Sequence, residues 1–241
     1  MAWCFRLGPF TVSDHIPQQI LSRFDVNVGE HAVGDHCFRI LEVSNPDTLL
    51  DDISPSAFAV DERLPYWAEL WTSSLALAGH CLEQPPLHGL RVLDLGCGLG
   101  LAGIAAARNG ASVLFADYDQ DAMLFAEWNA RANLDGMCLT RTSFRVADWR
   151  EPEALGTFEV VLGADIVYER RTFAPLLTCL HTVLAAGGEA WLAEPDRSLG
   201  SEFFAFASDL GWKIRMTDKH LERRGRTSVI RIAMLTPGGH A

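Results

Sequence analysis

The hydrophobic positions of this chain switch repeatedly between strand-like runs and helical spacing. Strand-like runs occur at residues 92–95, 112–116, 143–146, 159–164 and 189–193. Segments with apolar residues at helical spacing follow them, at residues 101–109, 121–133, 172–184 and 201–210. Alternating strands and helices are typical of a parallel sheet with right-handed crossovers and helices on both faces. The pattern therefore predicts an α/β, Rossmann-like, doubly wound fold.

The end of the chain breaks this alternation. Residues 212–216 and 228–235 are both strand-like, and only a polar, basic stretch joins them. We interpret that stretch as a loop, which is too short for the helical crossover that a parallel pair needs. The sequence therefore predicts a mostly parallel, seven-stranded sheet with an antiparallel last strand.

The first part of the chain has a weaker pattern. Residues 24–28 and 37–43 alternate between apolar and polar positions, with glycines between them, which predicts a hairpin. Apolar residues then recur at helical spacing over residues 67–82, so we expect an amphipathic helix with Trp67 and Trp71 on one face. We predict a small β-rich appendage at residues 1–62 and the main domain at residues 63–241.

Composition narrows the functional classes. The 241 residues include 31 acidic and 20 basic side chains, and the net charge of −11 argues against general nucleic-acid binding. The six cysteines form no C-x-x-C pair, and we find no leader-like or membrane-length apolar segment, so we expect a cytoplasmic protein without membrane association. The eight histidines are isolated, and no metal site is predicted. None of these features indicates an oligomeric state.

The most informative segment is the strand that ends near Asp94 and the glycine turn after it. Gly96, Gly98 and Gly100 form this turn, and an alanine-rich helix follows. Glycines allow positive φ and the close approach of a ligand, and a helix start provides unpaired N–H groups. This pattern is typical of a nucleotide-cofactor turn. It also fits the dinucleotide fingerprint, with Asp117 about 20 residues further on, where an acid would hold a ribose hydroxyl.

Asp94 discriminates between two cofactor classes. A pyrophosphate at this turn would meet its carboxylate instead of bare amide dipoles. S-adenosylmethionine carries no phosphate, and it offers an ammonium, a cationic sulfur and a ribose diol from which Asp117 could accept. The antiparallel end of the sheet also favours a methyltransferase sheet over a dehydrogenase sheet of six parallel strands. We therefore predict S-adenosylmethionine as the cofactor and keep a dinucleotide as the alternative.

Four successive strands of the predicted sheet bring an aspartate to the same edge. Asp94, Asp117, Asp148 and Asp165 each lie where a strand ends. Clustered carboxylates repel one another unless a cationic or hydrogen-bond-donating ligand lies among them, so the set favours a ligand site. For any one of them alone, a helix N-cap is the alternative. Trp149 could lie against an adenine face while Asp148 accepts from the exocyclic amine, or it could be an ordinary core tryptophan.

Residues 165–168 read Asp-Ile-Val-Tyr and follow the fourth predicted strand. In methyl transfer, positive charge leaves sulfur and develops on the attacking nitrogen, so a carboxylate that faces the nucleophile stabilises that charge. We predict that Asp165 and Tyr168 are catalytic and that the tyrosine orients the amine. A lysine amine has a reference pKa of about 10.4 and first has to lose its proton, which an apolar, aromatic channel favours.

Nucleic-acid amino-methyltransferases carry an Asn/Asp-Pro-Pro-aromatic tetrapeptide at this point. The chain has no such prolines, which counts against a nucleic-acid base as the substrate.

Taken in order, these motifs resemble those of the non-histone protein-lysine methyltransferases of the seven-β-strand class, from about residue 65 to the C-terminus. The resemblance implies that Asp165 and Tyr168 match a D-x-x-Y motif near the target lysine. It also makes Glu194 a candidate substrate-binding residue, although the turn reads Glu-Pro-Asp-Arg where the family has Glu-x-Arg. The implied cofactor site consists of six residues: Trp71, Asp94, Gly96, Asp117, Trp149 and Ala164.

Residues 65–71 and 194–197 are also similar to bacterial relatives, some of which are nicotinamide N-methylases. The sequence thus predicts an S-adenosylmethionine-dependent N-methyltransferase whose substrate is a protein with an accessible lysine. A small amine or heteroaromatic nitrogen compound is the alternative acceptor. A non-catalytic protein that binds S-adenosylmethionine is the alternative from a different class, since a fold does not dictate its function.

Overall fold

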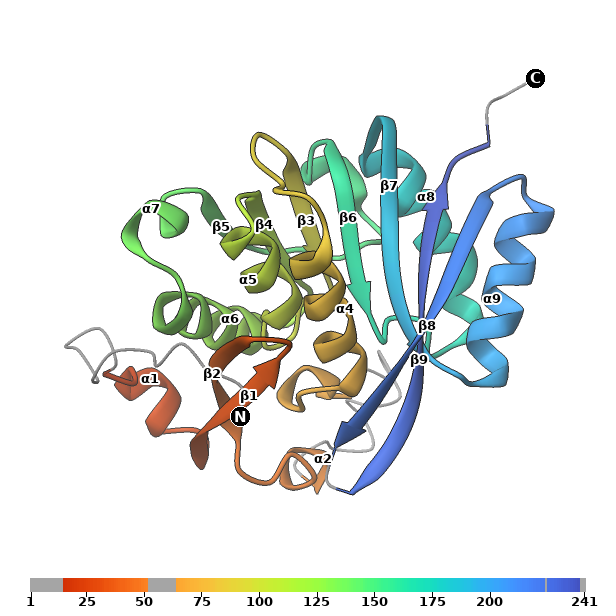
Figure 1. Cartoon of the computed structure of the whole chain (residues 1–241). Helices are drawn as coiled ribbons and strands as arrows, with labels where there is room; N and C mark the ends of the chain where they lie inside the picture. The colour runs from red at the N-terminus through yellow and green to blue at the C-terminus, as the bar shows by residue number, and fades with distance from the viewer. Residues whose placement is uncertain (1–14, 52–63, 224, 239–241) are drawn as a thin grey trace.

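Seven strands form the central sheet in the order β5-β4-β3-β6-β7-β9-β8 (Figure 1). Their bounds are β3 Arg91–Leu95, β4 Ser112–Asp117, β5 Thr142–Val146, β6 Phe158–Ala164, β7 Leu184–Pro195, β8 Lys213–Arg223 and β9 Arg226–Thr236. The pairs among β3 to β7 are parallel, whereas β9 is antiparallel to both of its neighbours. The predicted sheet is confirmed. This computed structural model describes residues 15–51, 64–223 and 225–238.

Helices cover both faces of this sheet (Figure 1). Successive strand residues point to opposite faces, so in β3 Val92 joins one hydrophobic cluster and Leu93 joins the other. The first cluster includes residues of α4 (Thr72–Glu83), α5 (Leu101–Arg108) and α6 (Gln120–Asn133). The second includes residues of α8 (Phe173–Val183) and α9 (Ser198–Asp209). This two-sided cover confirms the doubly wound architecture.

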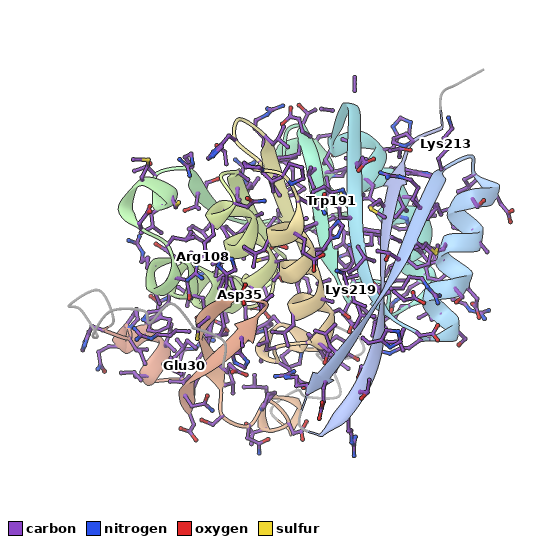
Figure 2. All side chains as sticks on the ribbon, viewed as in Figure 1. Glu30, Asp35, Arg108, Trp191, Lys213 and Lys219 are labelled. Atoms are coloured by element: carbon purple, nitrogen blue, oxygen red, sulfur yellow. The ribbon has the colours of Figure 1, made fainter. Side chains whose placement is uncertain are left out.

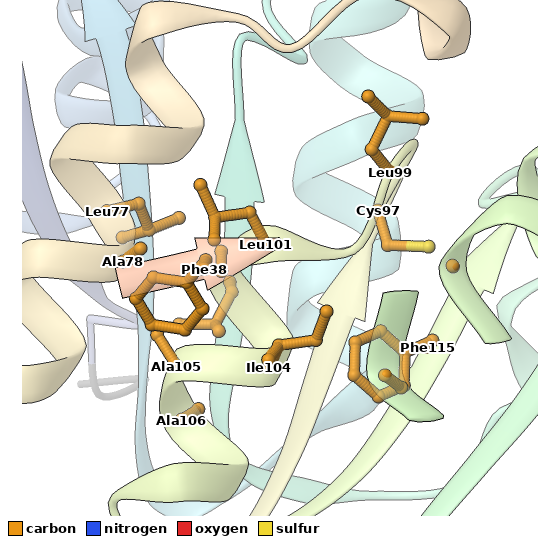
Figure 3. Packing of buried hydrophobic residues seen from close by; sticks show 14 of the residues in the cluster. Phe38, Leu77, Ala78, Cys97, Leu99, Leu101, Ile104, Ala105, Ala106 and Phe115 are labelled. Carbon is orange, nitrogen blue, oxygen red and sulfur yellow. The ribbon is translucent and has the colours of Figure 1, made fainter. Parts of the chain in front are cut away.

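Helices α4 and α5 pack closely in the first cluster because small side chains face each other. Leu77 and Ala78 of α4 lie beside Ala105 of α5, and Phe38 closes the cluster from a neighbouring strand (Figure 3). All four side chains are fully buried. This contact fixes the start of α5, and with it the glycine turn, relative to the start of α4.

The predicted N-terminal hairpin is confirmed as β1 (Val26–Val33) and β2 (His36–Val43), which pair in antiparallel fashion. The position of Asn129 and Asn133 at the end of a helix predicts capping residues, and this prediction is wrong. Their side-chain oxygens accept from the backbone N–H groups of β2, at 2.7 Å from Leu41 and 2.9 Å from Arg39. The two amides thus replace a neighbouring strand at this edge of the hairpin.

Arg108 also holds the hairpin in place. Its guanidinium lies 4.1 Å from the centre of the Phe38 ring and donates to the carbonyl oxygen of Cys37 (Figure 2). The predicted boundary between residues 62 and 63 lies outside the described residues.

The helix expected over residues 67–82 is shorter than predicted. A 3-10 turn, η2, covers Tyr66–Ala68, the chain is extended at Trp71, and α4 begins at Thr72. Trp67 and Trp71 therefore do not share a helix face. Trp67 packs in the core, whereas the indole of Trp71 donates to the Tyr66 carbonyl oxygen at 2.8 Å.

The polar stretch between the last two predicted strands is not a loop. Strands β8 and β9 pair from Lys213 with Thr236 as far as Arg223 with Arg226, beyond the last pair of β7 and β9 at Pro195 and Ile230. Its polar residues are largely exposed and show no apolar alternation, so hydropathy predicts the two strands but misses their extension through this stretch. Lys219 of this ribbon lies beside α4 (Figure 2), where its ammonium pairs with Glu83 at 2.5 Å.

The remaining described elements are short. They are α1 Gln18–Leu21, α2 Thr48–Asp51, α7 Gly136–Leu139, η3 Pro152–Ala154 and η4 Arg170–Thr172. Within the described ranges, no helix has both the length and the apolar character that crossing a bilayer requires.

Candidate functional site

The glycine turn after β3 has the backbone conformation that the sequence predicts. Gly96 and Gly98 have φ of 63° and 50°, in the left-handed region that favours glycine. A Cβ atom on Gly96 would lie 3.0 Å from the side chain of Ile166 and 3.3 Å from the ring of Trp149. The turn therefore depends on the absence of a side chain at Gly96 for both its conformation and its packing.

Asp94 lies beneath this turn. Its side chain is buried, and Oδ2 accepts from the backbone N–H of Gly103 at 2.8 Å, which ties the first turn of α5 to β3. Burial raises the pKa of this carboxyl to about 7. A Cβ atom at Gly103 would lie 2.8 Å from that oxygen, so the absence of a side chain at Gly103 allows this close packing. Direct contact of Asp94 with a cofactor stays a prediction.

Asp117 ends β4 and faces the opening above the turn. Its Oδ2 accepts from the N–H of Gly98 at 3.0 Å, and its Oδ1 accepts from the N–H of Asp119 at 3.1 Å. Burial raises the pKa of this carboxyl to about 6. The Asp117 carboxyl thus accepts the hydrogen bond of the Gly98 N–H, a backbone group of the turn to which a pyrophosphate would otherwise bind.

Two adjoining cavities open at this edge of the sheet, with volumes of about 200 and 60 Å³. Both are lined by Gly96, Asp117, Trp149 and Tyr168. Apart from Asp94 and Glu194, every predicted site residue lines at least one cavity. Asp148 lines the larger cavity, and the smaller one is lined by Trp71, Gly98, Gly100, Ala164 and Asp165.

Aromatic rings surround the junction of the two cavities. The ring of Tyr66 lies 5.5 Å from that of Tyr168 and 6.1 Å from that of Trp71, and the rings of Trp149 and Tyr168 are 6.5 Å apart. Tyr66 is absent from the predicted site, although it belongs to the aromatic segment at residues 65–71 that the sequence analysis compares with bacterial relatives. The rings provide an apolar wall that also attracts cations through their faces.

Asp148 has a partner within the protein. The guanidinium of Arg150 approaches its two carboxylate oxygens at 3.0 and 2.6 Å, and the backbone N–H of Arg150 donates to Oδ1 at 2.9 Å. The predicted acceptance from an adenine amine therefore has to share this carboxylate with Arg150.

Asp165 follows β6 with φ of 57°, the only non-glycine residue with positive φ among those described. Such a backbone costs about 1–2 kcal/mol, so its surroundings have to hold it in place. Its N–H donates to the carbonyl oxygen of Ala193 at 2.9 Å. The side chain is 6% exposed, and its oxygens accept from Arg197 Nη1 at 3.1 Å and from Ser73 Oγ at 3.3 Å. Burial raises the pKa of Asp165, and Arg197 opposes that shift.

Glu194 supports the same loop from behind. It lies at the end of β7, and its Oε1 accepts from the N–H groups of Ile166 at 3.0 Å and Val167 at 3.1 Å. Its side chain is buried, and burial raises its pKa well above the ordinary value, with the nearby Asp165 charge adding to the shift. Glu194 thus fixes the backbone between Asp165 and Tyr168, and the structure gives it no place in the lining of either cavity.

The residues near the site that are absent from the sequence prediction include Tyr66, Ser73 and Arg197. The sequence did single out the turn that contains Arg197, because it departs from the family pattern. Nothing in the local sequence pairs Ser73 with Asp165, since the two are 92 positions apart.

Comparisons with known proteins agree with this architecture. Residues 66–208, more than half of the chain, match a family model described as lysine methyltransferase. The chain is 41% identical to protein N-lysine methyltransferase METTL21A of Xenopus tropicalis over 124 residues, which cover 50% of this chain and 57% of that protein. It is 28% identical to the histidine protein methyltransferase 1 homolog of Dictyostelium discoideum over 129 residues, covering 52% and 41%. The chain thus spans about half the length of the curated relatives it matches.

A solved structure supports the fold. The ribosomal protein L11 methylase of Lactobacillus delbrueckii subsp. bulgaricus superposes with a TM-score of 0.54 at 19% identity, covering 71% of this chain and 81% of that one. The family match agrees with the predicted resemblance to lysine methyltransferases, and the solved structure confirms the predicted fold. Since the family match runs from the segment before α4 through most of α9, and so across the whole glycine turn and both cavities, the chain belongs to the lysine methyltransferase family.

Proposed function

We propose that this protein transfers a methyl group from S-adenosylmethionine to the side-chain amine of a lysine in another protein. The observation that carries the proposal is the position of Asp165 and Tyr168. Both line the smaller cavity, which also contains the glycine turn, and Tyr168 belongs to the aromatic wall. The family match and the similarity to METTL21A support lysine as the acceptor.

The residues of the two cavities fit the methyl donor. Asp117 offers a carboxylate to the two hydroxyls of a ribose, and Trp149 offers a ring face to an adenine. Gly96 and Gly98 have a left-handed backbone and line the smaller cavity, so the backbone of the turn can approach a ligand closely. The carboxyl groups at this edge suit a ligand that carries a sulfonium and an ammonium and no phosphate.

When bound, S-adenosylmethionine supplies a methyl group whose C–S bond breaks, with its electron pair staying on sulfur, while the lone pair of the neutral amine forms the C–N bond. The Asp165 carboxylate stabilises the positive charge that develops on this nitrogen. The rings of Tyr66, Trp71 and Tyr168 hold the aliphatic stem of the lysine and exclude water from it. Glu194 keeps the Asp165 loop in position through its two backbone hydrogen bonds.

The test is methyl transfer from radiolabelled S-adenosylmethionine into fractionated host proteins. We expect the wild type to label protein and Asp165→Asn to reduce the initial rate about 100-fold, the usual effect of removing one group that stabilises transition-state charge. The matched control is Asp209→Asn, at the exposed end of α9, which removes the same charge far from the cavities. Calorimetry should give similar affinities for the cofactor in the wild type and in Asp165→Asn.

The labelled product identifies the acceptor. Methyl-lysine after hydrolysis of the labelled proteins supports the proposal. Methyl-histidine would indicate a histidine acceptor, as in the name of the Dictyostelium discoideum relative. Label confined to a protein-free extract would favour a small amine as the acceptor. Undiminished labelling by Asp165→Asn would remove the role of that residue, and tight cofactor binding without any acceptor would indicate a non-catalytic protein.

A cytoplasmic location is part of the same proposal. It is supported by the five cysteines within the described ranges, none of which forms a disulfide. Microscopy of the tagged full chain in its host tests it.

A further inference from the structure

We propose that Arg197 is a positioning residue that keeps the target amine uncharged. Its guanidinium offsets the charge of the Asp165 carboxylate, so that an amine beside that carboxylate can lose its proton near neutral pH. The inference rests on the proposed function, because it concerns the same amine acceptor, and it adds a residue to which the sequence prediction gives no role.

The geometry of the pair is the first support. Arg197 Nη1 lies 3.1 Å from Asp165 Oδ1, and the side chain of Arg197 is 51% exposed whereas that of Asp165 is 6% exposed. The guanidinium therefore sits between the buried carboxylate and solvent. Arg197 occupies the N-cap position of α9, and its N–H donates to the Pro195 carbonyl oxygen at 2.7 Å. The backbone thus holds Arg197 at the end of β7, next to the loop that Glu194 supports.

The charges around Asp165 are the second support. Glu69, which lines the smaller cavity, acts on the Asp165 carboxyl as a further acidic group, and the Asp165 charge in turn acts on the buried Glu194 carboxyl. Asp196, beside Arg197, is paired with Arg231 at 3.3 Å, and Arg231 also contacts Asp218 at 3.2 Å. Ser73 contributes a neutral hydroxyl. Among the residues that the structure describes, Arg197 is thus the cation that acts directly on Asp165.

Without this cation, the site would hold the wrong form of its substrate. An opposite charge within about 4–6 Å favours the charged form of an amine and raises its pKa by about 1–3 units. The ammonium has no lone pair and cannot accept a methyl group. In the proposed reaction it first gives one proton to water, and the neutral amine then attacks. Arg197 lowers the cost of that proton loss and leaves Asp165 as a hydrogen-bond acceptor for the amine N–H.

The side-chain type fits this role. A guanidinium stays protonated throughout the accessible pH range, so it does not compete for the proton that the substrate releases.

The first measurement is the pH dependence of methyl transfer into host proteins, from pH 6.5 to 10, for the wild type, Arg197→Gln and Arg197→Lys. We expect Arg197→Gln to shift the profile about one unit to higher pH, with a rate about tenfold lower at pH 7 and close to the wild type at pH 10. Arg197→Lys keeps the charge and should restore the profile. Arg215→Gln removes the same charge from an exposed residue of β8, which pairs with Glu189 of β7, and should leave the profile unchanged.

The second measurement is calorimetric binding of n-butylammonium at pH 7 in the presence of S-adenosylhomocysteine. Arg197→Gln should bind this cation several-fold more tightly than the wild type while it methylates more slowly. A merely structural role would weaken both properties. In an Asp165→Asn background, Arg197→Gln should strengthen butylammonium binding less, because the main charge that holds the guanidinium at the site and that it offsets has gone.

An equal loss of rate at every pH, together with weaker butylammonium binding, would overturn the proposal. Thermal unfolding of each variant checks that it folds, and Arg197→Met serves the same purpose if Arg197→Gln does not. If the wild type labels no protein, the proposed function fails. The butylammonium titration still decides whether Arg197 disfavours a cation at Asp165.

Discussion

Replacing Glu194 tests whether the Asp165 loop depends on an acceptor oxygen or on a charge. Glu194→Ala would leave the N–H groups of Ile166 and Val167 without their acceptor, and both residues are almost fully buried at 3% and 2% exposure. Each buried unpaired N–H costs about 1–3 kcal/mol, so we expect a loss of about 2–6 kcal/mol in the free energy of unfolding. The loop would then also relax the positive φ of Asp165, and methyl transfer should fall at least about 100-fold.

Glu194→Gln separates the two explanations. Glutamine keeps a carbonyl oxygen where Oε1 lies, and burial already favours the protonated, uncharged form of Glu194. We therefore expect Glu194→Gln to lose less than about 1 kcal/mol and to keep its activity within a few-fold. Urea denaturation and labelling of host proteins measure both quantities. Glu202→Ala, which breaks an exposed pair with Arg170, is the control and should cost less than about 1 kcal/mol.

The reasoning is wrong if Glu194→Gln is as damaging as Glu194→Ala. That outcome would mean that the carboxylate charge, and not its hydrogen bonds to the loop, is what the site requires.

Three further predictions concern the support of the site. Asn129→Ala should lower the free energy of unfolding by about 2–4 kcal/mol in urea denaturation, because it leaves the N–H of Leu41 and the carbonyl oxygen of Leu99 unpaired in the core. The control Glu127→Ala, at an exposed position of the same helix, should have little effect. Gly96→Ala should weaken S-adenosylmethionine binding at least about tenfold by calorimetry, since its Cβ would meet Trp149 at positive φ, whereas Gly136→Ala, which has open space, should not. The pKa values of Asp94 (about 7) and Asp117 (about 6) are raised, so above about pH 4 the folded state binds more protons than the unfolded state. The stability that these two groups contribute is therefore present below pH 4 and is lost as the pH rises to 7. Asp94→Asn should flatten this decline, and an unfolding free energy that rises from about pH 4 to pH 7 would contradict the assignment.

The strands of the sheet and its mostly parallel character follow from the sequence because both depend on local patterns. Strands such as β3 are buried on both faces and read as short apolar runs, and the helices between them keep their helical spacing. The exposed parts of β8 and β9 are not predicted because the backbone pairing of the two strands stabilises them, and this pairing leaves no hydrophobic pattern in the sequence. The break in the helix before Thr72 is not predicted because the sequence pattern there is misleading. Trp67 and Trp71 have helical spacing although the chain is extended at Trp71.

The site is predicted only as far as it follows strand ends. Asp117 and Asp165 lie at the cavities because the carboxyl ends of parallel strands meet at one edge. Ser73 lies at the start of α4, and Arg197 lies in the turn before α9. Their contacts with Asp165 depend on how these two helices pack against the sheet. Pairing across such distances has no signature in one sequence.

The acidic edge divides into two structural roles that the sequence could not separate. Asp94 and Glu194 lie beneath the surface, where each accepts backbone N–H groups, and they position the glycine turn and the Asp165 loop. Asp117 and Asp165 keep a side toward the cavities and have donors of their own in Gly98 and Arg197. Every one of these four carboxyl groups therefore has a hydrogen-bond donor within the protein. These hydrogen bonds fix the four carboxyl groups in position before a cationic ligand binds. Such preorganised groups stabilise the charge of a transition state most effectively.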